Sequence, residues 1–204
     1  MKNFILLIFT VCLFSCDRKT QTFNFDQYDL KHRLMENNAA TQHYQFLDSD
    51  KYELTITAKN YKKQLTVLEK EDKIYWYCNK EFVLSHSLSS KDRMGSCYDI
   101  PPFLNRQISL IGYKTYILSG KKYTIYSFDE INGGDSEIAT YYLKETGFIC
   151  YFDLKGKSYY FLSGTSEFKG ITSDVIEKIR KKLVNDSTFF AVEMIKRTPP
   201  IKFQ

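Results

Sequence analysis

At 204 residues, the chain is long enough to form one domain with a substantial hydrophobic core. Its 29 basic and 24 acidic side chains leave a mild surplus of +5, spread along the sequence. A nucleic-acid-binding protein is expected to concentrate its basic residues in a stripe. The densest basic cluster here, in residues 178–182, falls within a predicted helix, where it forms a solvated face. We therefore expect no nucleic-acid partner.

The first 15 residues have the pattern of an export signal. A short start with one lysine precedes an apolar run from Phe4 to Phe14. A transmembrane helix requires about 20 apolar residues, whereas the shorter run has the length of a signal-peptide core. We therefore leave residues 1–15 out of the mature domain.

The apolar run ends in Leu13-Phe14-Ser15-Cys16. This segment resembles the lipobox of bacterial lipoproteins, with leucine three positions before the cysteine and a small residue directly before it. Phe14 is larger than the usual residue at its position. The resemblance implies cleavage before Cys16 and attachment of lipid to its thiol, and two or more acyl chains give stable anchoring. We expect a protein anchored to the inner or outer membrane of the cell envelope, facing the periplasm or the cell surface.

The mature chain is predicted to consist of a tether and a single domain. Residues 16–27 are polar apart from Phe23 and Phe25, and we interpret them as the lipidated tether. Residues 28–204 then form one mostly-β domain. Near its start, residues 28–46 contain apolar side chains at helical spacing, which indicates a short helix. These side chains are Leu30, Leu34 and Met35.

From Tyr52 onwards the sequence has the pattern of β-strands. Alternation places Tyr52, Leu54 and Ile56 on one face. The 16 tyrosines and 16 phenylalanines fall largely in such strand patterns, which favours packing over stacking on sugars. Strands are predicted at residues 52–57, 65–68, 74–78, 81–85, 107–119, 121–128, 137–145, 147–154 and 157–163.

The longest predicted loop spans residues 86–106. Its first part is rich in serine and charge, and Pro101-Pro102 prevents regular strand pairing. Long loops in compact domains are often functional. Tyr98, Phe103 and Arg106 are of residue types enriched at binding hot spots. We treat them as candidate partner-binding residues, and the alternative is a simple crossover between two halves of the sheet.

The C-terminal part changes to helical periodicity. Thr172-Ser173-Asp174 supplies oxygens that can cap a helix spanning residues 172–184, and Asn185-Asp186 ends it. The apolar residues expected to be buried beneath this helix are Val175, Ile176, Ile179 and Leu183. Residues 187–195 return to a strand pattern.

Three cysteines follow Cys16. Cys78 and Cys97 are candidates for one disulfide, since an oxidising compartment permits it. Cys150 lies in an apolar stretch and is expected to be a small buried hydrophobic residue. None of the three belongs to a C-x-x-C pair, so zinc and thioredoxin-like redox functions have no support.

No catalytic motif is present in the sequence. His32, His43 and His86 form no H-x-x-x-H pair, and there is no Gly-x-Ser-x-Gly elbow and no phosphate-binding loop. His86 has Ser85 and Ser87 beside it, but sequence neighbours do not make a triad. We expect a protein that is not an enzyme and has neither a metal nor a cofactor.

The predicted fold is α+β and mostly β. It consists of a twisted antiparallel sheet from about Tyr52 to Ile195 with the C-terminal helix packed on one face, and a closed lipocalin-like barrel is the alternative. This architecture is similar to that of uncharacterised small lipoproteins of Gram-negative envelopes. Some lipoproteins of this size act as immunity proteins and others as accessory subunits of envelope complexes.

The resemblance implies a non-enzymatic module whose partner is an envelope protein or an incoming foreign protein. The alternative is a glycan-binding or glycan-processing lipoprotein. An exposed row of aromatic residues beside paired carboxylates in a groove would favour the glycan alternative, whereas a flat or convex aromatic patch would favour a protein partner.

Overall fold

The computed structural model describes residues 20–59, 61–78, 80–89, 94–95, 107–131, 137–153, 157–165 and 171–190. These residues form one 12-stranded sheet and one helix. The bounds are β1 Thr20–Asp29, β2 Leu34–Phe46, β3 Lys51–Ala58, β4 Tyr61–Lys70, β5 Lys73–Cys78, β6 Glu81–Ser87, β7 Met94–Gly95, β8 Gln107–Leu118, β9 Lys121–Ile131, β10 Glu137–Leu143, β11 Gly147–Asp153, β12 Ser158–Thr165 and α1 Ser173–Val184.

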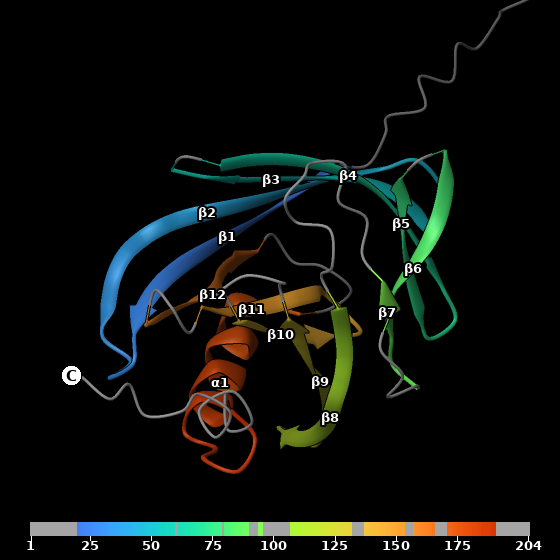
Figure 1. Cartoon of the computed structure of the whole chain (residues 1–204). Coiled ribbons are helices and arrows are strands. Elements are labelled where there is room, and N and C mark those ends of the chain that lie inside the picture. Colours follow the sequence, from blue (N-terminus) through green and yellow to red (C-terminus); the bar gives the residue numbers. More distant parts are fainter. Residues whose placement is uncertain are drawn as a thin grey trace, which may run out of the picture.

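The sheet consists of two antiparallel meanders. Strands β1 to β6 pair in chain order, β7 to β12 do the same, and β1 joins the two halves by pairing with β12. The sheet curves so strongly that its two end strands, β6 and β7, contact each other (Figure 1). The predicted mostly-β fold is confirmed, and the nearly closed sheet also fits the barrel alternative.

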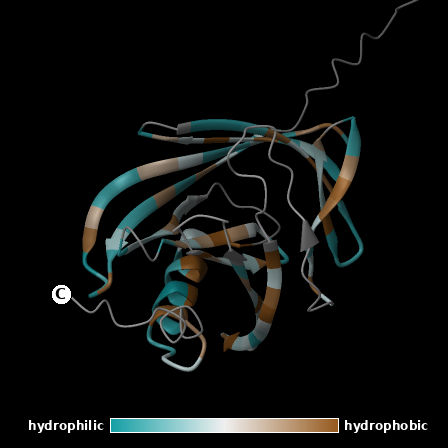
Figure 2. Ribbon diagram, viewed as in Figure 1, coloured by the Kyte–Doolittle hydropathy of each residue, from teal (hydrophilic) through white to brown (hydrophobic). Residues whose placement is uncertain are grey.

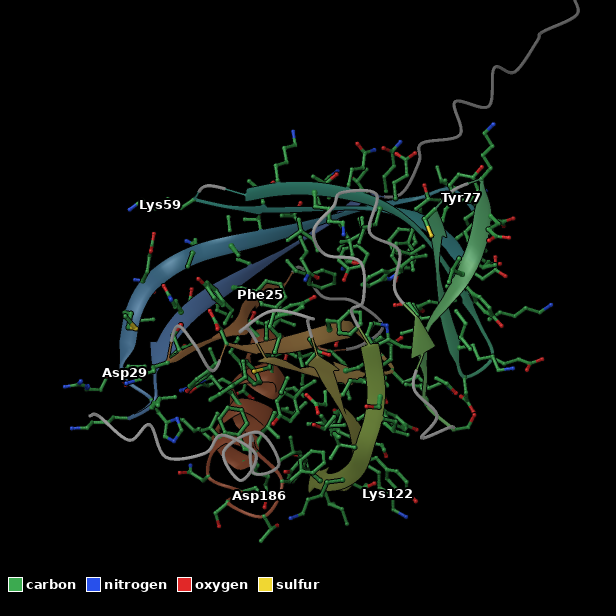
Figure 3. The ribbon with its side chains drawn as sticks, viewed as in Figure 1. Phe25, Asp29, Lys59, Tyr77, Lys122 and Asp186 are labelled. Atoms are coloured by element: carbon green, nitrogen blue, oxygen red, sulfur yellow. The ribbon has the colours of Figure 1, made fainter. Side chains whose placement is uncertain are left out.

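Aromatic side chains fill the space enclosed by the two halves. From β1, Phe23 packs edge-on against Tyr44 with ring centroids 5.0 Å apart, and Phe25 packs against Tyr151 of β11 at 5.8 Å. Phe25 lies beneath the curved upper wall in Figure 3. Burial of such rings contributes about 1.5–3 kcal/mol each, so β1 is a central strand of the fold.

The same hydrophobic core continues beneath α1. Thr172 caps the helix by accepting a hydrogen bond from the backbone nitrogen of Val175, as predicted. The helix carries apolar and polar residues on different sides (Figure 2). Its buried residues are Ile176, Ile179, Leu183 and Val184, whereas Val175, which was expected to be buried, is half-buried.

The predicted tether at residues 16–27 is too long. Strand β1 begins at Thr20, and Phe23 and Phe25 are only 2% and 1% exposed. The segment looked polar because only two of its residues are apolar. Their alternation with Thr22 and Asn24 nevertheless places both rings on the buried face. The sheet therefore begins at Thr20 and not near Tyr52.

The short helix predicted within residues 28–46 is wrong. These residues form the end of β1, a turn and β2, and β2 pairs with both β1 and β3. Backbone pairing on both sides outweighs a weak helical spacing. The three apolar residues behind that prediction lie exposed at and next to the turn, and they are Leu30, Leu34 and Met35.

The strand predicted after α1 is wrong over residues 187–190. Asn185 caps the helix, and the chain then turns around Asp186. The Asp186 carbonyl accepts hydrogen bonds from the backbone nitrogens of Phe189 and Phe190, at 3.0 and 2.8 Å. This turn places Phe190 on Tyr141, with ring centroids 5.4 Å apart. Residues 191–195 lie outside the described residues.

The export signal, the lipobox and Cys16 also lie outside the described residues, so they remain predictions from the sequence. Within the described part of the chain, no helix has the length and apolar character needed to cross a membrane.

Candidate functional site

The partner-binding residues predicted from the sequence, Tyr98, Phe103 and Arg106, lie outside the described residues. The predicted loop itself begins later than expected, because β6 continues to Ser87. Cys78 is disulfide-bonded. Its predicted partner, Cys97, lies outside the described residues, so that pairing remains a prediction. Cys150 is buried with a free thiol, as predicted, and burial raises the pKa of that thiol well above its usual value.

His86 belongs to the aromatic core. Its ring is fully buried, and its Nδ1 lies 2.9 Å from the Ser85 hydroxyl. Phe128 and Phe148 pack edge-on against the imidazole, with centroids 4.9 and 5.0 Å away. A catalytic histidine must be within reach of its substrate. The Ser85–His86 pair is enclosed by rings, and we interpret it as part of the core packing.

Three tyrosines form a ladder across neighbouring strands. Tyr113 of β8 lies opposite Tyr126 of β9, which in turn lies opposite Tyr142 of β10. Opposed residues of paired strands point to the same face of a sheet. The ladder runs from solvent into the protein, because Tyr113 is 67% exposed, Tyr126 is half-buried and Tyr142 is 3% exposed.

The outer part of this ladder belongs to an exposed surface, which we call the tyrosine face. The rings of Tyr113 and Tyr126 are 5.8 Å apart and tilted by 45°. A hydrogen bond of 2.9 Å joins the hydroxyls of Thr115 and Thr124 beside them, and Ile117 is 59% exposed. The tyrosine face consists of Tyr113, Thr115, Ile117, Thr124 and Tyr126.

The opposite face of β8 is covered. The Tyr116 hydroxyl donates a hydrogen bond of 3.0 Å to Asp186, and Lys114 forms an ion pair with the same carboxylate. Asp186 lies below α1, near the β8–β9 hairpin that Lys122 marks (Figure 3). One face of this hairpin is thus packed against the end of α1, while the other is left to solvent.

The inner end of the ladder opens onto a cleft of about 230 Å³. The cleft lies where the β2–β3 turn, the β4–β5 turn and the end of β10 meet. We call it the Glu69 cleft. Its lining residues are Ser49, Asp50, Glu69, Glu71, Lys73, Ile74, Leu88, Tyr142 and Lys144.

Two tyrosine hydroxyls hold the Glu69 carboxylate in place. Tyr52 donates a hydrogen bond of 2.7 Å to Oε1 of Glu69, and Tyr142 donates one of 3.2 Å to the same oxygen. Burial, together with the negative charge of Glu69, raises the pKa of both hydroxyls well above the usual value. Both tyrosines therefore remain protonated and act as hydrogen-bond donors.

Glu69 has no counterion among the described residues. Lys144, which also lines the cleft, is paired with Asp72 instead, and its ammonium lies 2.7 Å from that carboxylate. The hydrogen bond to Asp72 raises the pKa of Lys144. Three carboxylates, those of Asp50, Glu69 and Glu71, thus line the cleft with two lysines, and one of these lysines is paired with Asp72. The cleft is locally acidic in a chain whose net charge is +5.

A small inner cavity of about 20 Å³ adjoins the Glu69 cleft, and Glu69 and Lys144 line both. The hydroxyl of Thr146, a residue only 3% exposed, also lines this cavity and has no hydrogen-bond partner. The volume is sufficient for one water molecule. The wall behind Glu69 therefore offers an unsatisfied polar group.

Sequence reasoning missed Glu69 and Tyr142. Glu69 lies between the strands predicted at residues 65–68 and 74–78, but it continues the inward-facing positions of Leu65 and Val67 at a spacing of two residues. An acidic side chain in register with buried apolar residues is the signal that could have identified it. Tyr142 lies 73 residues further along the chain, so only the folded sheet brings the two together.

Within the described residues, no group of three or more His, Cys, Asp or Glu side chains is arranged to hold a metal ion. Comparison with known proteins yields no matching family model and no matching curated protein. The geometry of the chain itself therefore carries the functional interpretation.

Proposed function

We propose that the chain is a lipid-anchored protein of the cell envelope that binds another protein through the tyrosine face and catalyses no reaction. The observation that carries this proposal is the exposure of Tyr113 and Ile117, which are 67% and 59% exposed on one strand face. Tyrosine is enriched at binding hot spots, and exposed apolar patches mark interaction sites.

The shape of the tyrosine face favours a protein as the partner. A sugar ring stacks best on a flat aromatic platform, whereas the rings of Tyr113 and Tyr126 are tilted by 45° to each other. The hydroxyls of Thr115 and Thr124 lie between these rings and Ile117 and add hydrogen-bonding groups. A mixed surface of this kind suits the side chains of an envelope protein or an incoming foreign protein. Tyr98, Phe103 and Arg106 remain predicted additional contacts.

The proposed anchor would hold this surface near a membrane. Strand β1 begins at Thr20, only a few residues after Cys16. An extended chain spans at most about 3.6 Å per residue, so the domain would lie within about 14 Å of the lipidated cysteine. Partners would then be envelope components or proteins arriving at the membrane, as for an immunity protein or an accessory subunit.

A glycan-binding or glycan-processing function is the second candidate. It is favoured by the proximity of the tyrosine ladder to the carboxylates of the Glu69 cleft. Tyr142, the ladder residue closest to these carboxylates, is only 3% exposed, so its ring offers little surface for stacking. We therefore rank this function below protein binding.

The anchor is tested by mass spectrometry of the membrane fraction. We expect an acylated N-terminal peptide beginning at Cys16, and release of the Cys16→Ala protein from the membrane. A soluble wild-type product that begins at another residue would contradict the anchor.

The tyrosine face is tested by site-specific photo-crosslinking in intact cells. A crosslinking amino acid at Tyr113 or Ile117 should trap the same single protein. The matched control is Tyr77, which is 47% exposed and lies at the other end of the molecule from Lys122 and the β8–β9 hairpin (Figure 3). Equal adducts at Tyr77, or none at Tyr113 and Ile117 together with saturable binding on a glycan array, would overturn the protein partner.

A further inference from the structure

We propose that the Glu69 cleft binds a cationic group, the ammonium or guanidinium of a lysine or arginine side chain that the bound protein inserts. This inference rests on the proposed function for the source of the cation. The chemistry of the cleft is independent of that source.

The charge of Glu69 is left unpaired by the described chain. This half-buried carboxylate accepts two tyrosine hydrogen bonds on Oε1, while its Oε2 makes no hydrogen bond and no ion pair with a described residue. Charges withdrawn from water are normally paired, because an uncompensated charge is costly. Glu69 is therefore incomplete without a cation from outside the described chain.

The charge around Glu69 has the sign that a cation requires. Lys144 is already neutralised by Asp72 at 2.7 Å. The other lysine of the lining is Lys73, and the lining has three carboxylates, those of Asp50, Glu69 and Glu71. The field in the cleft attracts a cation and repels an anion.

The size and shape of the cleft suit one side chain. A volume of about 230 Å³ is below the about 300–1,000 Å³ typical of sites for whole small-molecule ligands. Ile74 and Leu88 supply an apolar wall. The methylene stem of a lysine or arginine can pack along this wall while its charged end reaches the carboxylate.

The carboxylate is also preorganised. Tyr52 and Tyr142 fix its orientation before any ligand arrives. Little side-chain freedom is then lost on binding, which favours affinity. Thr146 adds a buried hydroxyl without a partner on the wall behind Glu69. A water in the inner cavity can connect this hydroxyl to the bound cation.

The cleft adjoins the tyrosine face. Tyr142 lines the cleft and also lies opposite Tyr126 on the neighbouring strand. A protein bound on the tyrosine face can therefore reach Glu69 with one long side chain. In this proposal, the exposed rings and the cleft act together as one site.

The experiment is a calorimetric titration of the purified full-length protein with Nα-acetyl-arginine amide and Nα-acetyl-lysine amide. Nα-acetyl-citrulline amide is the neutral probe of matched shape, and glucose represents a neutral sugar. We expect saturable binding of one or both cationic probes, weakened by salt, and no saturable binding of the neutral probes. Failure of both cationic probes, or equal binding of citrulline or glucose, would overturn the cationic site.

Two variants should change the affinity for the cationic probe in opposite directions. Glu69→Gln should weaken binding of the cationic probe by about tenfold or more, because a charge-assisted contact is lost. Lys144→Met should strengthen it, because the competing cation is removed and Asp72 is freed. The control Glu81→Gln removes an exposed carboxylate on β6, away from the cleft lining, and should leave affinity unchanged. Unchanged affinity in Glu69→Gln, or weaker binding in Lys144→Met, would overturn the assignment.

The source of the cation is tested separately from its chemistry. Saturating arginine probe should reduce the photo-crosslinked adduct at Tyr113, because the probe competes with the partner's side chain. If the adduct forms but the probe does not compete, insertion of a partner side chain is overturned while the proposed function stands. If the probe binds through Glu69 and no adduct forms at Tyr113, the protein partner is overturned and the cleft is a site for a free amine or guanidine.

Discussion

Two partly buried charged side chains in this protein both lie next to tyrosines. One of them has a counterion, and the other has none among the described residues. On α1, the guanidinium of Arg180 lies 4.6 Å from the ring centre of Tyr28 and donates two hydrogen bonds, of 2.7 and 2.8 Å, to Glu177. In the cleft, Glu69 is likewise held by tyrosines, Tyr52 and Tyr142, but no cation of the described chain pairs with it.

The presence or absence of a counterion distinguishes a charge that stabilises the fold from a charge that is a candidate for binding a ligand. The Glu177 carboxylate raises the pKa of Arg180, and Arg180 in turn lowers the pKa of Glu177. Each group thus stabilises the charged form of the other, and the pair is complete within the fold. Glu69 has ordered donors but no counterion among the described residues, which is the arrangement expected of a site that gives up stability for binding.

The largest expected loss of stability comes from disrupting the apolar core beneath α1, the helix that carries Arg180. Ile179 is fully buried beneath α1, so Ile179→Asp places an unpaired charge in an apolar core. We expect a loss of at least about 4 kcal/mol in the free energy of unfolding, or no folded protein. Urea denaturation followed by circular dichroism measures it. The exposed control Lys182→Gln should change stability by only about 0.5 kcal/mol. Similar midpoints for the two variants would mean that α1 does not pack as described.

The next largest effect is a dependence of stability on pH, caused by Asp186 just after the end of α1. Burial alone would raise the pKa of Asp186, but hydrogen bonds from Lys114, Thr188 and Tyr116 lower it to about 2. Because the folded pKa lies below the ordinary value of 3.8, the associated stability is complete above about pH 5 and is lost as the pH falls towards 2. We expect this carboxyl to contribute up to about 2 kcal/mol.

Thermal unfolding between pH 6 and pH 2 tests this dependence. Asp186→Asn should already be less stable at pH 6 and should lose less stability on acidification than the wild type. The exposed residue Asp174 provides the control variant, Asp174→Asn. Parallel pH profiles for wild type and Asp186→Asn would contradict the role of Asp186.

A smaller loss of stability is expected from breaking the ion pair between Arg180 and Glu177. Arg180→Met keeps the long stem over Tyr28 and removes the charge. The Glu177 side chain is 43% exposed, so water can solvate the carboxylate that is left, and we expect a loss of about 1–2 kcal/mol. Chemical denaturation measures this loss. Lys178→Met, which removes an exposed pair with Asp174, should cost no more than about 0.5 kcal/mol. Equal losses in the two variants would show that Arg180 is no more structural than a surface charge.

Local periodicity predicted most of the fold. The strands at residues 52–57 and 74–78 and the helix at residues 172–184 depend on side chains close in sequence, and all are present. Strand β1 was missed because Phe23 and Phe25 are its only apolar residues before Tyr28. Its partners, β2 and β12, supply the pairing that makes it central.

The candidate site could not be predicted in the same way. Tyr52 lies 17 residues before Glu69, and Tyr142 lies 73 residues after it. Each looks like an ordinary strand residue in the sequence. The curvature of the sheet brings them together, and bulges bend strands, as at the register shift between Tyr141 and Tyr142. No short sequence pattern specifies such a meeting point.

The most direct test of Glu69 as a binding charge is the free energy of unfolding of Glu69→Gln, measured beside that of Arg180→Met. The amide oxygen of glutamine can still accept the hydrogen bonds of Tyr52 and Tyr142, while the uncompensated charge disappears. We predict that Glu69→Gln is as stable as the wild type within about 0.5 kcal/mol, or more stable, while Arg180→Met is less stable. A loss of more than about 2 kcal/mol in Glu69→Gln would show that Glu69 is a structural charge like Arg180, and would contradict a cleft awaiting a cation.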